Sequence, residues 1–429
     1  MNLSKFGKKF TQPTGITQLM EDLGNANNSG NPDIVMLGGG NPALIPESND
    51  LFVKELQALI SSSKVDSMLG LYDGPLGFDE FREALADMLN DHYGWGLDAN
   101  NIALSNGSQS NFFSLFNLLA GEMTDGSNNK ILFPLAPEYV GYADQGLSDD
   151  MFVSIKPKIN ILENDSASDA SHSKQKQFKY EIDFDVLEET LAETHRNIGA
   201  ICVSRPTNPT GNVITNDELS RLDALAQQYQ IPLIIDNAYG HPFPGAIYID
   251  AKLTWNPNTI LCMSLSKLGL PGLRTGIVIA NHDIINALSR INGVMILAPN
   301  SVGPTLMTRM IKDKELLNLC RNVIKPFYED KAATAVRVFD EVFADQPVYL
   351  HKLEGAFFMW LWFKDMDITG QELYTRLKRE DVYIIPGHNF FIGIEDDWEH
   401  KHQCIRINYA KDEATLRKGL EAIHRIITS

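Results

Sequence analysis

Residues 259–280 read "TILCMSLSKLGLPGLRTGIVIA", two apolar runs joined by a turn that carries Lys267 and Arg274. Both runs are continuously apolar, and this pattern predicts strands that are buried on both faces, as in mostly parallel sheets. Lysine and arginine are rarely buried without a partner. The turn is therefore either a loop with two solvated cations or part of a binding site.

Apolar runs of strand length also occur earlier in the chain, at 131–135, 199–204 and 231–236. A helix is predicted over 215–229, because apolar residues recur there at helical spacing and Thr215 with Glu218 forms a capping box. Strands that alternate with helices are typical of βαβ units. The middle of the chain therefore predicts an α/β core.

The pattern changes from about residue 325, where a long helix-like segment is followed by apolar runs at 356–363, 382–387 and 404–410. This order predicts a smaller α+β domain, completed by part of the N-terminal segment. The polar stretch 163–177 is predicted to be a surface insertion rather than a linker between domains.

The 429 residues carry a net charge of −18, and no Lys/Arg-rich block offsets it. Such a surface disfavours nucleic acid and anionic membranes as partners. The four cysteines lie far apart without a CxxC pair, which favours reduced thiols in the cytoplasm over a disulfide framework. No apolar h-region opens the sequence, and no apolar stretch is long enough to span a bilayer, so a cytoplasmic protein is expected.

Polar residues stand where several of the predicted strands end. Asn106, Gly107 and Ser108 precede an apolar-faced helix, and such a turn is a ready phosphate site, although most turns of this kind are only helix caps. Asn208 follows the 199–204 run in "RPTNPTGN", where it could simply form a turn. Asp236 ends the next run in "IIDNAYG", where it caps a helix or, beside a ring nitrogen, keeps that nitrogen protonated.

The turn after residue 264 adds a possible nucleophile. A lysine among apolar and cationic neighbours has a lowered pKa, which makes Lys267 a candidate nucleophilic amine. Ser264 and Arg274 can both hold a phosphate. Each feature has an ordinary structural explanation. Together, in this order and at these strand ends, they indicate a site for pyridoxal phosphate.

The motifs "NGSQ", "NPTGN", "DNAY", "SLSKLGLPGLR" and "CIRINY" follow one another along nearly the whole chain. In this order they resemble the class-I pyridoxal-phosphate-dependent aminotransferases. The resemblance implies the α/β fold of type I, with a large cofactor-binding domain at 51–324 built on a mostly parallel seven-stranded sheet. Residues 1–50 with 325–429 would then form a smaller α+β domain and an N-terminal arm.

The resemblance also assigns a role to each matching residue. Lys267 would bond covalently to pyridoxal 5'-phosphate and move the proton during catalysis. Asp236 would hold the pyridine nitrogen, and Asn208 and Tyr239 the ring hydroxyl. The residues of the phosphate cup would be Ser264, Arg274, Gly107, Ser108 and Gln109.

Aromatic residues complete the implied cofactor site. Tyr139 in "PEYVGY" matches the ring that stacks on the cofactor, and Tyr142 competes for that role. Tyr72 in "LYDGPLG" matches a tyrosine that reaches the phosphate of the neighbouring subunit. The resemblance therefore implies a homodimer with shared active sites.

Arg406 matches the arginine that binds the substrate α-carboxylate, with Gly40 in the N-terminal segment that covers it and Asn208 beside it. Independently of the resemblance, Arg406 lies inside an apolar strand-like run, where an unpaired guanidinium is costly. A bound carboxylate would offset that cost by bidentate pairing. An internal ion pair explains the position about equally well.

The implied activity is a ping-pong transamination between amino acids and 2-oxo acids. The fuller stretches "LGGGNPALIPE", "YDGPLG" and "PGHNFF" resemble one subgroup, which exchanges the amino group between valine and pyruvate to give 3-methyl-2-oxobutanoate and alanine. Alternatives with the same cofactor are an alanine/glutamate or aromatic transaminase and a β-lyase. A non-catalytic regulator is disfavoured, because fewer than 40 residues precede "LGGGNP" and the chain is acidic.

The segment "HKHQC" (400–404) would place His400, His402 and Cys404 on one face if it were a strand. These are metal-ligand residue types. Arg406 would share that face, and its charge disfavours a nearby cation. Surface and packing roles are therefore preferred, and no metal site is expected.

Overall fold

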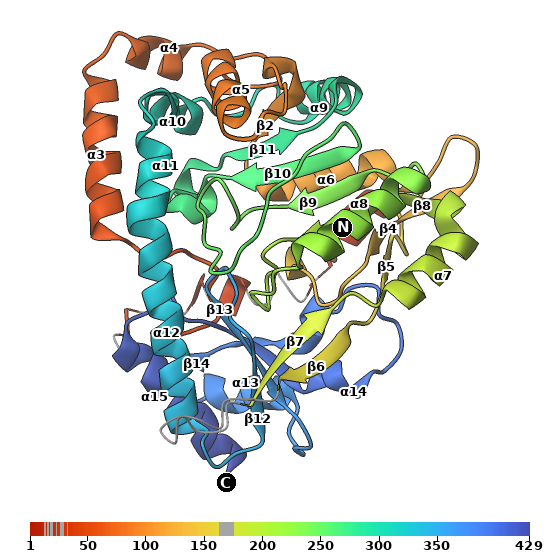
Figure 1. Ribbon diagram of the computed structural model, residues 1–429, viewed down its shortest axis with the longest axis vertical. Helices are drawn as coiled ribbons and strands as arrows, with labels where there is room; N and C mark the ends of the chain where they lie inside the picture. Colours follow the sequence, from red (N-terminus) through yellow and green to blue (C-terminus); the bar gives the residue numbers. More distant parts are fainter. Residues whose placement is uncertain are drawn as a thin grey trace.

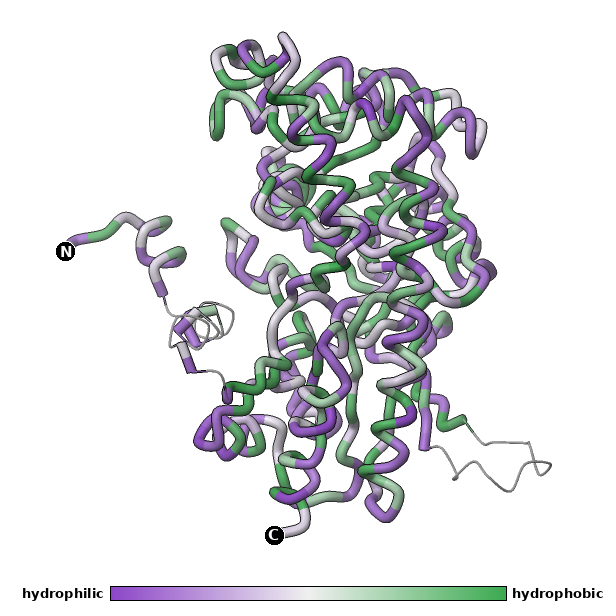
Figure 2. The backbone as a smooth tube through the Cα atoms, turned by 90° about the vertical axis from the view of Figure 1, so that its left-hand side faces the viewer, coloured by the Kyte–Doolittle hydropathy of each residue, from purple (hydrophilic) through white to green (hydrophobic). Residues whose placement is uncertain are grey.

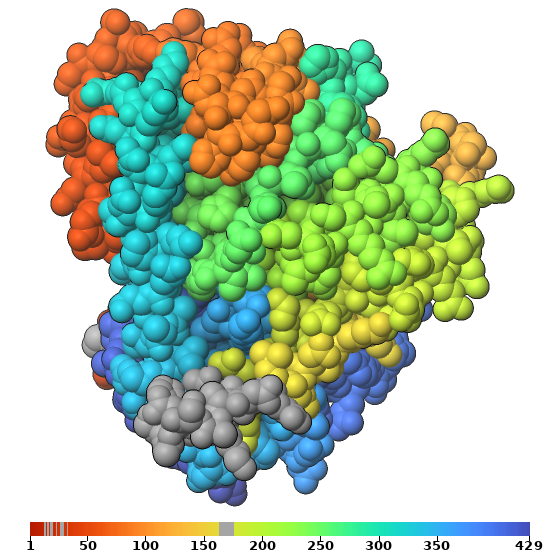
Figure 3. Space-filling view, viewed as in Figure 1, coloured from red at the N-terminus to blue at the C-terminus, as the bar shows by residue number. Residues whose placement is uncertain are grey.

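The computed structural model describes residues 1–12, 14, 17, 20–22, 24–25, 30–31, 33–162 and 176–429. Most of the predicted insertion at 163–177 lies outside these residues. Figure 1 shows two sheet-containing parts, one above the other, with the long helix α12 (Lys325–Val342) running from the upper part into the lower. In the space-filling view of Figure 3, residues of this region form a continuous strip across both parts.

The upper sheet contains eight strands within the described residues, in the order β2-β11-β10-β9-β8-β4-β3, with β5 also paired to β4. Their bounds are β2 Ile102–Ser105, β3 Gly121–Glu122, β4 Asn128–Phe133, β5 Phe152–Ser154, β8 Ile198–Ser204, β9 Leu233–Asp236, β10 Thr259–Ser264 and β11 Gly276–Ile279. Seven strands were expected. The difference arises at β4, which pairs with two very short strands, β3 and β5.

The quoted stretch 259–280 forms β10 and β11, which are the third and second strands in this order. Both strands are fully buried, as their continuous hydrophobicity predicted. Successive residues of β10 belong to different hydrophobic cores: Leu261 and Met263 face one, and Ile260 and Cys262 face the other. β10 is parallel to β9, but β11 is antiparallel to both of its neighbours. The connection 265–275 between β10 and β11 is shorter than the crossover of a dozen or more residues that a parallel partner needs.

Helices cover both faces of the upper sheet. The core on one side includes Leu219 and Leu222 of α8 (Asn216–Gln228), and the core on the other includes Phe112 and Phe116 of α6 (Ser108–Leu119). The Thr215–Glu218 capping box predicted for α8 is present. Nearby lie α5 Asp79–Tyr93, α9 His282–Met295 and α10 Val302–Lys312 (Figure 1).

The lower sheet has the order β15-β16-β13-β12-β7-β6. Its strands are β6 Lys158–Leu162, β7 Gln177–Glu181, β12 Val348–His351, β13 Phe358–Phe363, β15 Ile385–Pro386 and β16 Cys404–Asn408. A separate parallel pair joins β1 (Val35–Met36) to β14 (Val382–Tyr383), so the N-terminal segment reaches this part. β6 and β7 come from the middle of the chain and pair through β7 with β12. The domain division at residues 50 and 324 stays a prediction.

The remaining elements complete the two parts. The other helices are α1 Lys5–Phe10, α3 Pro46–Ile60, α4 Lys64–Gly70, α7 Phe184–Thr194, α11 Glu315–Leu319, α13 Gly370–Lys378, α14 Glu399–His402 and α15 Glu413–Ile427. Short helical turns cover η1 Ala99–Asn101, η2 Val140–Tyr142, η3 His195–Asn197, η4 Ser266–Leu268, η5 Pro271–Leu273, η6 Cys320–Ile324 and η7 Gly387–Phe390. Figure 2 shows α1 at the end of an arm beside the main body.

Two further features of the fold concern the hydrophobicity of its helices and the state of its cysteines. No helix in the described part of the chain combines the length and hydrophobicity needed to cross a bilayer. All four cysteines are free thiols, and all are buried.

The sheet register brings the predicted site residues to one edge. Ser204 at the end of β8 is in register with Asp236 at the end of β9, and Ser264 ends the neighbouring β10. On the far side of β10, Gly276 of β11 pairs with Ser105 at the end of β2. Ligands of open α/β sheets bind outside the carboxyl ends of the strands, and the site is built there.

Candidate active site

A cavity opens at this edge of the upper sheet, and nine of the predicted site residues line it. They come from six separate segments of the chain, so the fold rather than the sequence brings them together. The nine are Ser108, Gln109, Tyr139, Asn208, Asp236, Tyr239, Ser264, Lys267 and Arg274. Phe112, Ser204, Pro206, Ala238 and Ser266 also line the cavity and were not predicted.

Lys267 lies in η4, directly after β10. Its Nζ donates a hydrogen bond of 2.8 Å to the carbonyl oxygen of Gly40 and lies 5.4 Å from the centre of the Tyr239 ring. Burial lowers the pKa of Lys267 to about 8, and the charges of Arg406 and Arg274 act in the same direction. The amine is therefore much closer to its neutral, nucleophilic form at neutral pH than an exposed lysine is.

Asp236 enters the cavity from the end of β9. It accepts hydrogen bonds from the hydroxyl of Tyr142 at 2.5 Å and from the backbone N–H of Ala238 at 3.0 Å. Burial raises the pKa of Asp236, while these donors and Lys267 oppose the rise. A carboxylate in this position would stabilise a protonated ring nitrogen.

One end of the cavity is shaped for a phosphate. Gly107 caps the N-terminus of α6 with a φ of +100°, so the free N–H groups of the helix open toward the cavity. A Cβ at Gly107 would lie 2.4 Å from Nη2 of Arg274, which shows how closely the guanidinium approaches this turn. A helix N-terminus and a guanidinium that meet at a glycine fit a dianionic group.

Arg406 of β16 does not line the cavity itself but contacts Asn208 of its wall, and its side chain is almost fully buried. Its Nη1 donates to Oδ1 of Asn208 at 2.8 Å and its Nη2 to the carbonyl of Gly38 at 2.7 Å, but its Nε has no partner. No ion pair joins Arg406 to a carboxylate among the described residues, which removes the explanation by an internal pair. Burial lowers the pKa of Arg406 to about 10. A buried guanidinium without a counterion fits a ligand carboxylate.

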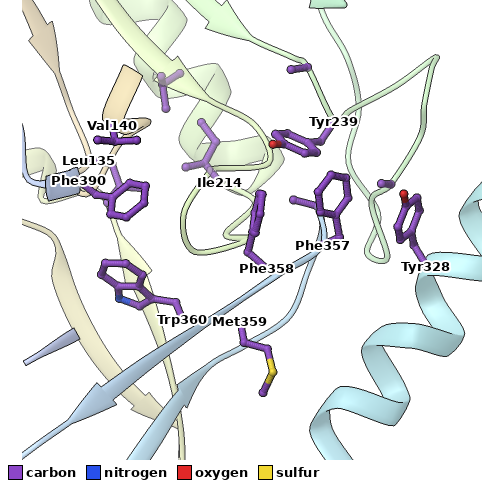
Figure 4. Close-up of a cluster of buried hydrophobic side chains, with 14 of the residues drawn as sticks. Leu135, Val140, Ile214, Tyr239, Tyr328, Phe357, Phe358, Met359, Trp360 and Phe390 are labelled. Carbon is purple, nitrogen blue, oxygen red and sulfur yellow. The ribbon is translucent and has the colours of Figure 1, made fainter. Parts of the chain in front are cut away.

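Aromatic side chains pack around Lys267 and Arg406. Phe357 lies between Tyr239 and Tyr328, with ring centres 5.2 Å from each, as Figure 4 shows. Phe358 lies under the guanidinium of Arg406, whose carbon is 4.3 Å from the ring centre. These contacts fix the rings that surround Lys267 and Arg406.

The structure separates the two tyrosines that competed for the stacking position. Tyr139 lines the cavity, and Gly141 makes room for it, since a Cβ there would lie 2.3 Å from the ring. Tyr142 is fully buried in η2 among Phe112, Phe116 and Phe133. The geometry therefore favours Tyr139 for stacking, whereas Tyr142 donates a hydrogen bond to Asp236.

Tyr72 and the histidine segment lie outside the cavity. The side chain of Tyr72 is 84% exposed and does not line the cavity of its own chain. Residues 400–404 do not form one strand, because α14 ends at His402 and β16 begins only at Cys404. His400 packs inward and hydrogen-bonds Tyr180, whereas His402 pairs with Asp397 outside. Within the described residues, no three potential ligands gather around a metal position.

Sequence reasoning missed residues in the cavity wall and behind it. Tyr142 was noticed only as a rival for stacking, and Ser204 and Glu138 were not singled out. Glu138 is buried and hydrogen-bonds both the backbone and the side chain of Ser204. The one signal available in the sequence was Glu138 itself, because a glutamate stands there beside an aromatic motif in a stretch that is otherwise apolar.

The chain is similar to known proteins over almost its whole length. Residues 166–423 match the family described as aminotransferase class I and II. The chain is 51% identical over 426 residues to the valine–pyruvate aminotransferase of Escherichia coli (strain K12), covering 99% of this chain and 97% of that one.

Two solved structures resemble the fold over almost its whole length. One is a putative amino-acid aminotransferase from Psychrobacter arcticum 273-4, with a TM-score of 0.95 and 46% identity, covering 100% of this chain and 98% of that chain. The other is the valine–pyruvate aminotransferase of Salmonella typhimurium LT2, with a TM-score of 0.86 and 48% identity, covering 96% and 98%.

Proposed function

The chain belongs to the class I and II aminotransferases, whose cofactor is pyridoxal 5'-phosphate, and we propose that it exchanges the amino group between valine and pyruvate. As an aminotransferase it acts on amino acids and 2-oxo acids. The choice of valine and pyruvate is supported by the two relatives from Escherichia coli and Salmonella typhimurium, which carry this activity in their names.

The described cavity supports a specific placement of the cofactor. Lys267 would hold its aldehyde carbon, Asp236 its ring nitrogen, and Asn208 and Tyr239 its ring hydroxyl. Tyr139 would stack on the ring. The phosphate would occupy the cup at the start of α6, among Gly107, Ser108, Gln109, Ser264 and Arg274.

Pyridoxal phosphate, when bound, supplies an aldehyde that bonds to amines and a protonated ring that accepts the electron pair of a broken Cα–H bond. The protein supplies the rest. Arg406 with Asn208 holds the substrate carboxylate, and the Gly38–Gly40 backbone covers it. The amine of Lys267, with a pKa lowered to about 8, would suit the transfer of a proton from the substrate Cα near neutral pH.

The observation that carries this proposal is that two basic groups, Lys267 in the cavity wall and the buried Arg406, have no carboxylate partner within the described residues. One would serve the reacting amine and the other the substrate carboxylate. The test is a half-reaction screen, in which the loaded, yellow protein is mixed with each amino acid and its absorbance is followed. Valine and alanine are expected to convert the cofactor fastest. Faster conversion by glutamate or aromatic amino acids would favour another transaminase, and release of pyruvate from β-substituted amino acids would favour a β-lyase.

The proposal includes a homodimer with two shared sites. Tyr72 is far more exposed than a tyrosine that packs on its own domain. Other large apolar side chains near it and around the end of α9 are also exposed: Leu69, Leu71, Val294 and Leu297. Exposed apolar patches of this kind mark interfaces. A twofold axis would place each Tyr72 at the phosphate cup of the other subunit.

Co-expression of two variants tests the shared site. Tyr72→Phe and Arg274→Ala chains should each retain the cofactor poorly. A heterodimer of the two would contain one site with both defects and one site with neither, so the mixture should regain activity. Heterodimers that form without any gain would place Tyr72 in its own subunit. The cytoplasmic location and the division into two domains belong to the same proposal.

A further inference from the structure

A chain of four hydrogen-bonding side chains runs behind the cavity, from Asp236 into the protein interior. Tyr142 donates to Oδ2 of Asp236 at 2.5 Å, and the oxygen of Ser204 lies 3.4 Å from the Tyr142 hydroxyl. Ser204 in turn contacts Oε2 of Glu138, and its backbone N–H donates to Oε1 at 2.9 Å. The four residues come from three neighbouring segments, after β4, at the end of β8 and at the end of β9.

The chain of hydrogen bonds ends at Glu138, whose carboxyl group has no cation beside it among the described residues. Glu138 is 1% exposed, and no lysine, arginine or histidine forms an ion pair with it among the described residues. The titratable groups that face it are Asp236, Tyr142 and Cys202, and each of these is neutral or negative. Burial raises the pKa of Glu138 to about 8, and the charge of Asp236 raises it further.

The two ends of the chain compete for one proton. Two carboxylates joined through buried hydroxyl groups cannot both be charged at low cost. Asp236 has the better environment for a negative charge, because Tyr142 and Ala238 donate to it and Lys267 lies on its cavity side. Glu138 accepts hydrogen bonds from the hydroxyl and backbone N–H of Ser204 and from the backbone of Tyr139, but among the described residues it has no cation beside it to balance a negative charge. The proton therefore belongs to Glu138.

We propose that Glu138 is a protonated positioning residue, which orients Ser204 and Tyr142 so that every hydroxyl in the chain donates toward Asp236. This inference rests on the proposed function, in which Asp236 must remain ionised beside the cofactor. A charged Glu138 would instead accept the Ser204 hydroxyl, and the Tyr142 hydroxyl would lose its own donor. No proton is consumed, since the neutral acid only fixes the direction of the hydrogen bonds.

Infrared spectra of the wild-type, cofactor-free protein at neutral pH test the location of the proton. A band of a buried, protonated carboxyl group should shift when glutamate is labelled with ¹³C and should stay in place when aspartate is labelled. A shift with labelled aspartate would assign the proton to Asp236, and the absence of such a band would mean that neither acid holds it. Both results overturn the proposal. Because no substrate or cofactor is present, this measurement is independent of which transamination the protein performs.

Variants test the consequence for stability and for the bound cofactor. The pKa of Glu138 is higher in the folded than in the unfolded chain, so its contribution to stability falls as the pH rises from about 5 to about 8. Glu138→Gln should remove this fall from the melting temperature of the cofactor-free protein. Tyr180→Phe, which removes an equally buried hydroxyl in the lower sheet, should keep it. An unchanged pH dependence in Glu138→Gln would overturn the proposal.

The absorbance of the loaded protein provides the second readout. Glu138→Gln still offers a neutral donor to Ser204, so the pH midpoint of the cofactor's absorbance change should stay within a few tenths of a unit of the wild type. Glu138→Ala and Tyr142→Phe, which interrupt the chain, should shift that midpoint by more. Equal midpoints in all three variants would contradict the positioning role. A wild-type protein that bound the cofactor without transaminating would instead contradict the proposed function.

Discussion

Two polar clusters differ in the charge that they keep: one lines the cavity and draws on both sheets, and the other lies within the lower sheet. The cavity cluster consists of Lys267, Asp236 and Arg406, and the histidine cluster of Tyr180, His351 and His400. In the histidine cluster, Tyr180 hydrogen-bonds Nε2 of His400 at 2.5 Å, and its backbone N–H donates to Nε2 of His351 at 3.2 Å. Burial lowers the pKa of both histidines to about 3, so both are neutral near pH 7.

The comparison shows how a structural cluster differs from a binding site. The histidines avoid the cost of burial by giving up their protons, and Trp360 completes the cluster by donating to the Tyr180 hydroxyl at 2.9 Å. Arg406 cannot do the same, because even its lowered pKa of about 10 leaves it charged. A buried group that must remain charged, with an unpartnered Nε, needs a counterion from outside the chain.

The largest expected effect concerns the lysine of the cavity cluster. Lys267→Ala should abolish transamination, because the same amine holds the cofactor and moves the proton. The variant should still fold and bind the cofactor without a covalent bond. Borohydride reduction of the loaded wild type should attach the cofactor to Lys267, and peptide mapping of the label checks this. A label on a different lysine would contradict the assignment.

The second largest effect is expected for Asp236→Asn. This variant should lose about 10²–10³-fold in kcat, which is typical when one electrostatic partner of the reacting centre is removed. The charge that keeps the ring nitrogen protonated is lost, while the fold should survive. Steady-state kinetics together with a melting curve separate the two effects. Wild-type turnover in this variant would exclude the proposed role of Asp236.

Arg406→Gln should act mainly on substrate binding. Charge-assisted hydrogen bonds contribute about 1.5–3 kcal/mol, so KM for amino acids should rise about 10–100-fold while the cofactor stays bound. The uncharged side chain also relieves a buried, unpaired cation, so the melting temperature of the cofactor-free protein should not fall. A large loss of stability with an unchanged KM would make Arg406 part of a structural cluster instead.

A smaller effect concerns the pH at which Lys267 reacts. Only the neutral amine attacks an aldehyde, so the rate of recombination with pyridoxal phosphate should rise with pH and level off above about 8. Arg406→Gln removes a positive charge that lowers this pKa, and its midpoint should therefore lie higher. Stopped-flow absorbance measures both midpoints. A midpoint near that of an exposed lysine, about 10.4, would mean that Lys267 is not shielded from water as described.

The smallest effect on activity is expected in the histidine cluster. Tyr180→Phe leaves Trp360 and His400 without their partner, at a cost of about 1–3 kcal/mol of stability. Its kcat and KM should match the wild type. Denaturant unfolding and steady-state kinetics on the same preparation check this, and a change in KM would show that the two clusters are not independent.

Much of the upper part could be predicted from the sequence. The apolar run at 259–264 coincides with β10, and the runs at 199–204 and 231–236 match β8 and β9 to within two residues. Strands buried on both faces show themselves by continuous hydrophobicity, and polar residues at their ends stand out against it. For this reason the pattern of residues alone places Asp236, Lys267 and Ser264 at one edge of a sheet.

Other features depend on contacts that no local pattern contains. Two tyrosines three residues apart, Tyr139 and Tyr142, look alike in the sequence, and only packing sends one into the cavity and the other behind Asp236. Glu138 and Ser204 meet because β4 and β8 are neighbours. The lower sheet includes β6 and β7, whose residues lie far from its other strands in the sequence. Apolar periodicity does not predict pairing between strands that are so distant.

The hydrogen bond from Lys267 to the carbonyl of Gly40 couples the inside of the cavity to its cover. An amine that bonds to the cofactor gives up N–H groups, and the Gly40 carbonyl must then find another donor. Gly38 is tied in the same way to Arg406, and Gly39 and Asn41 are tied to the amide of Asn408. The hydrogen bonds of the main chain at residues 38–41 therefore depend on what Lys267 and Arg406 bind. The rate of amide hydrogen exchange in these four residues would therefore report the fraction of sites in a preparation that hold the cofactor.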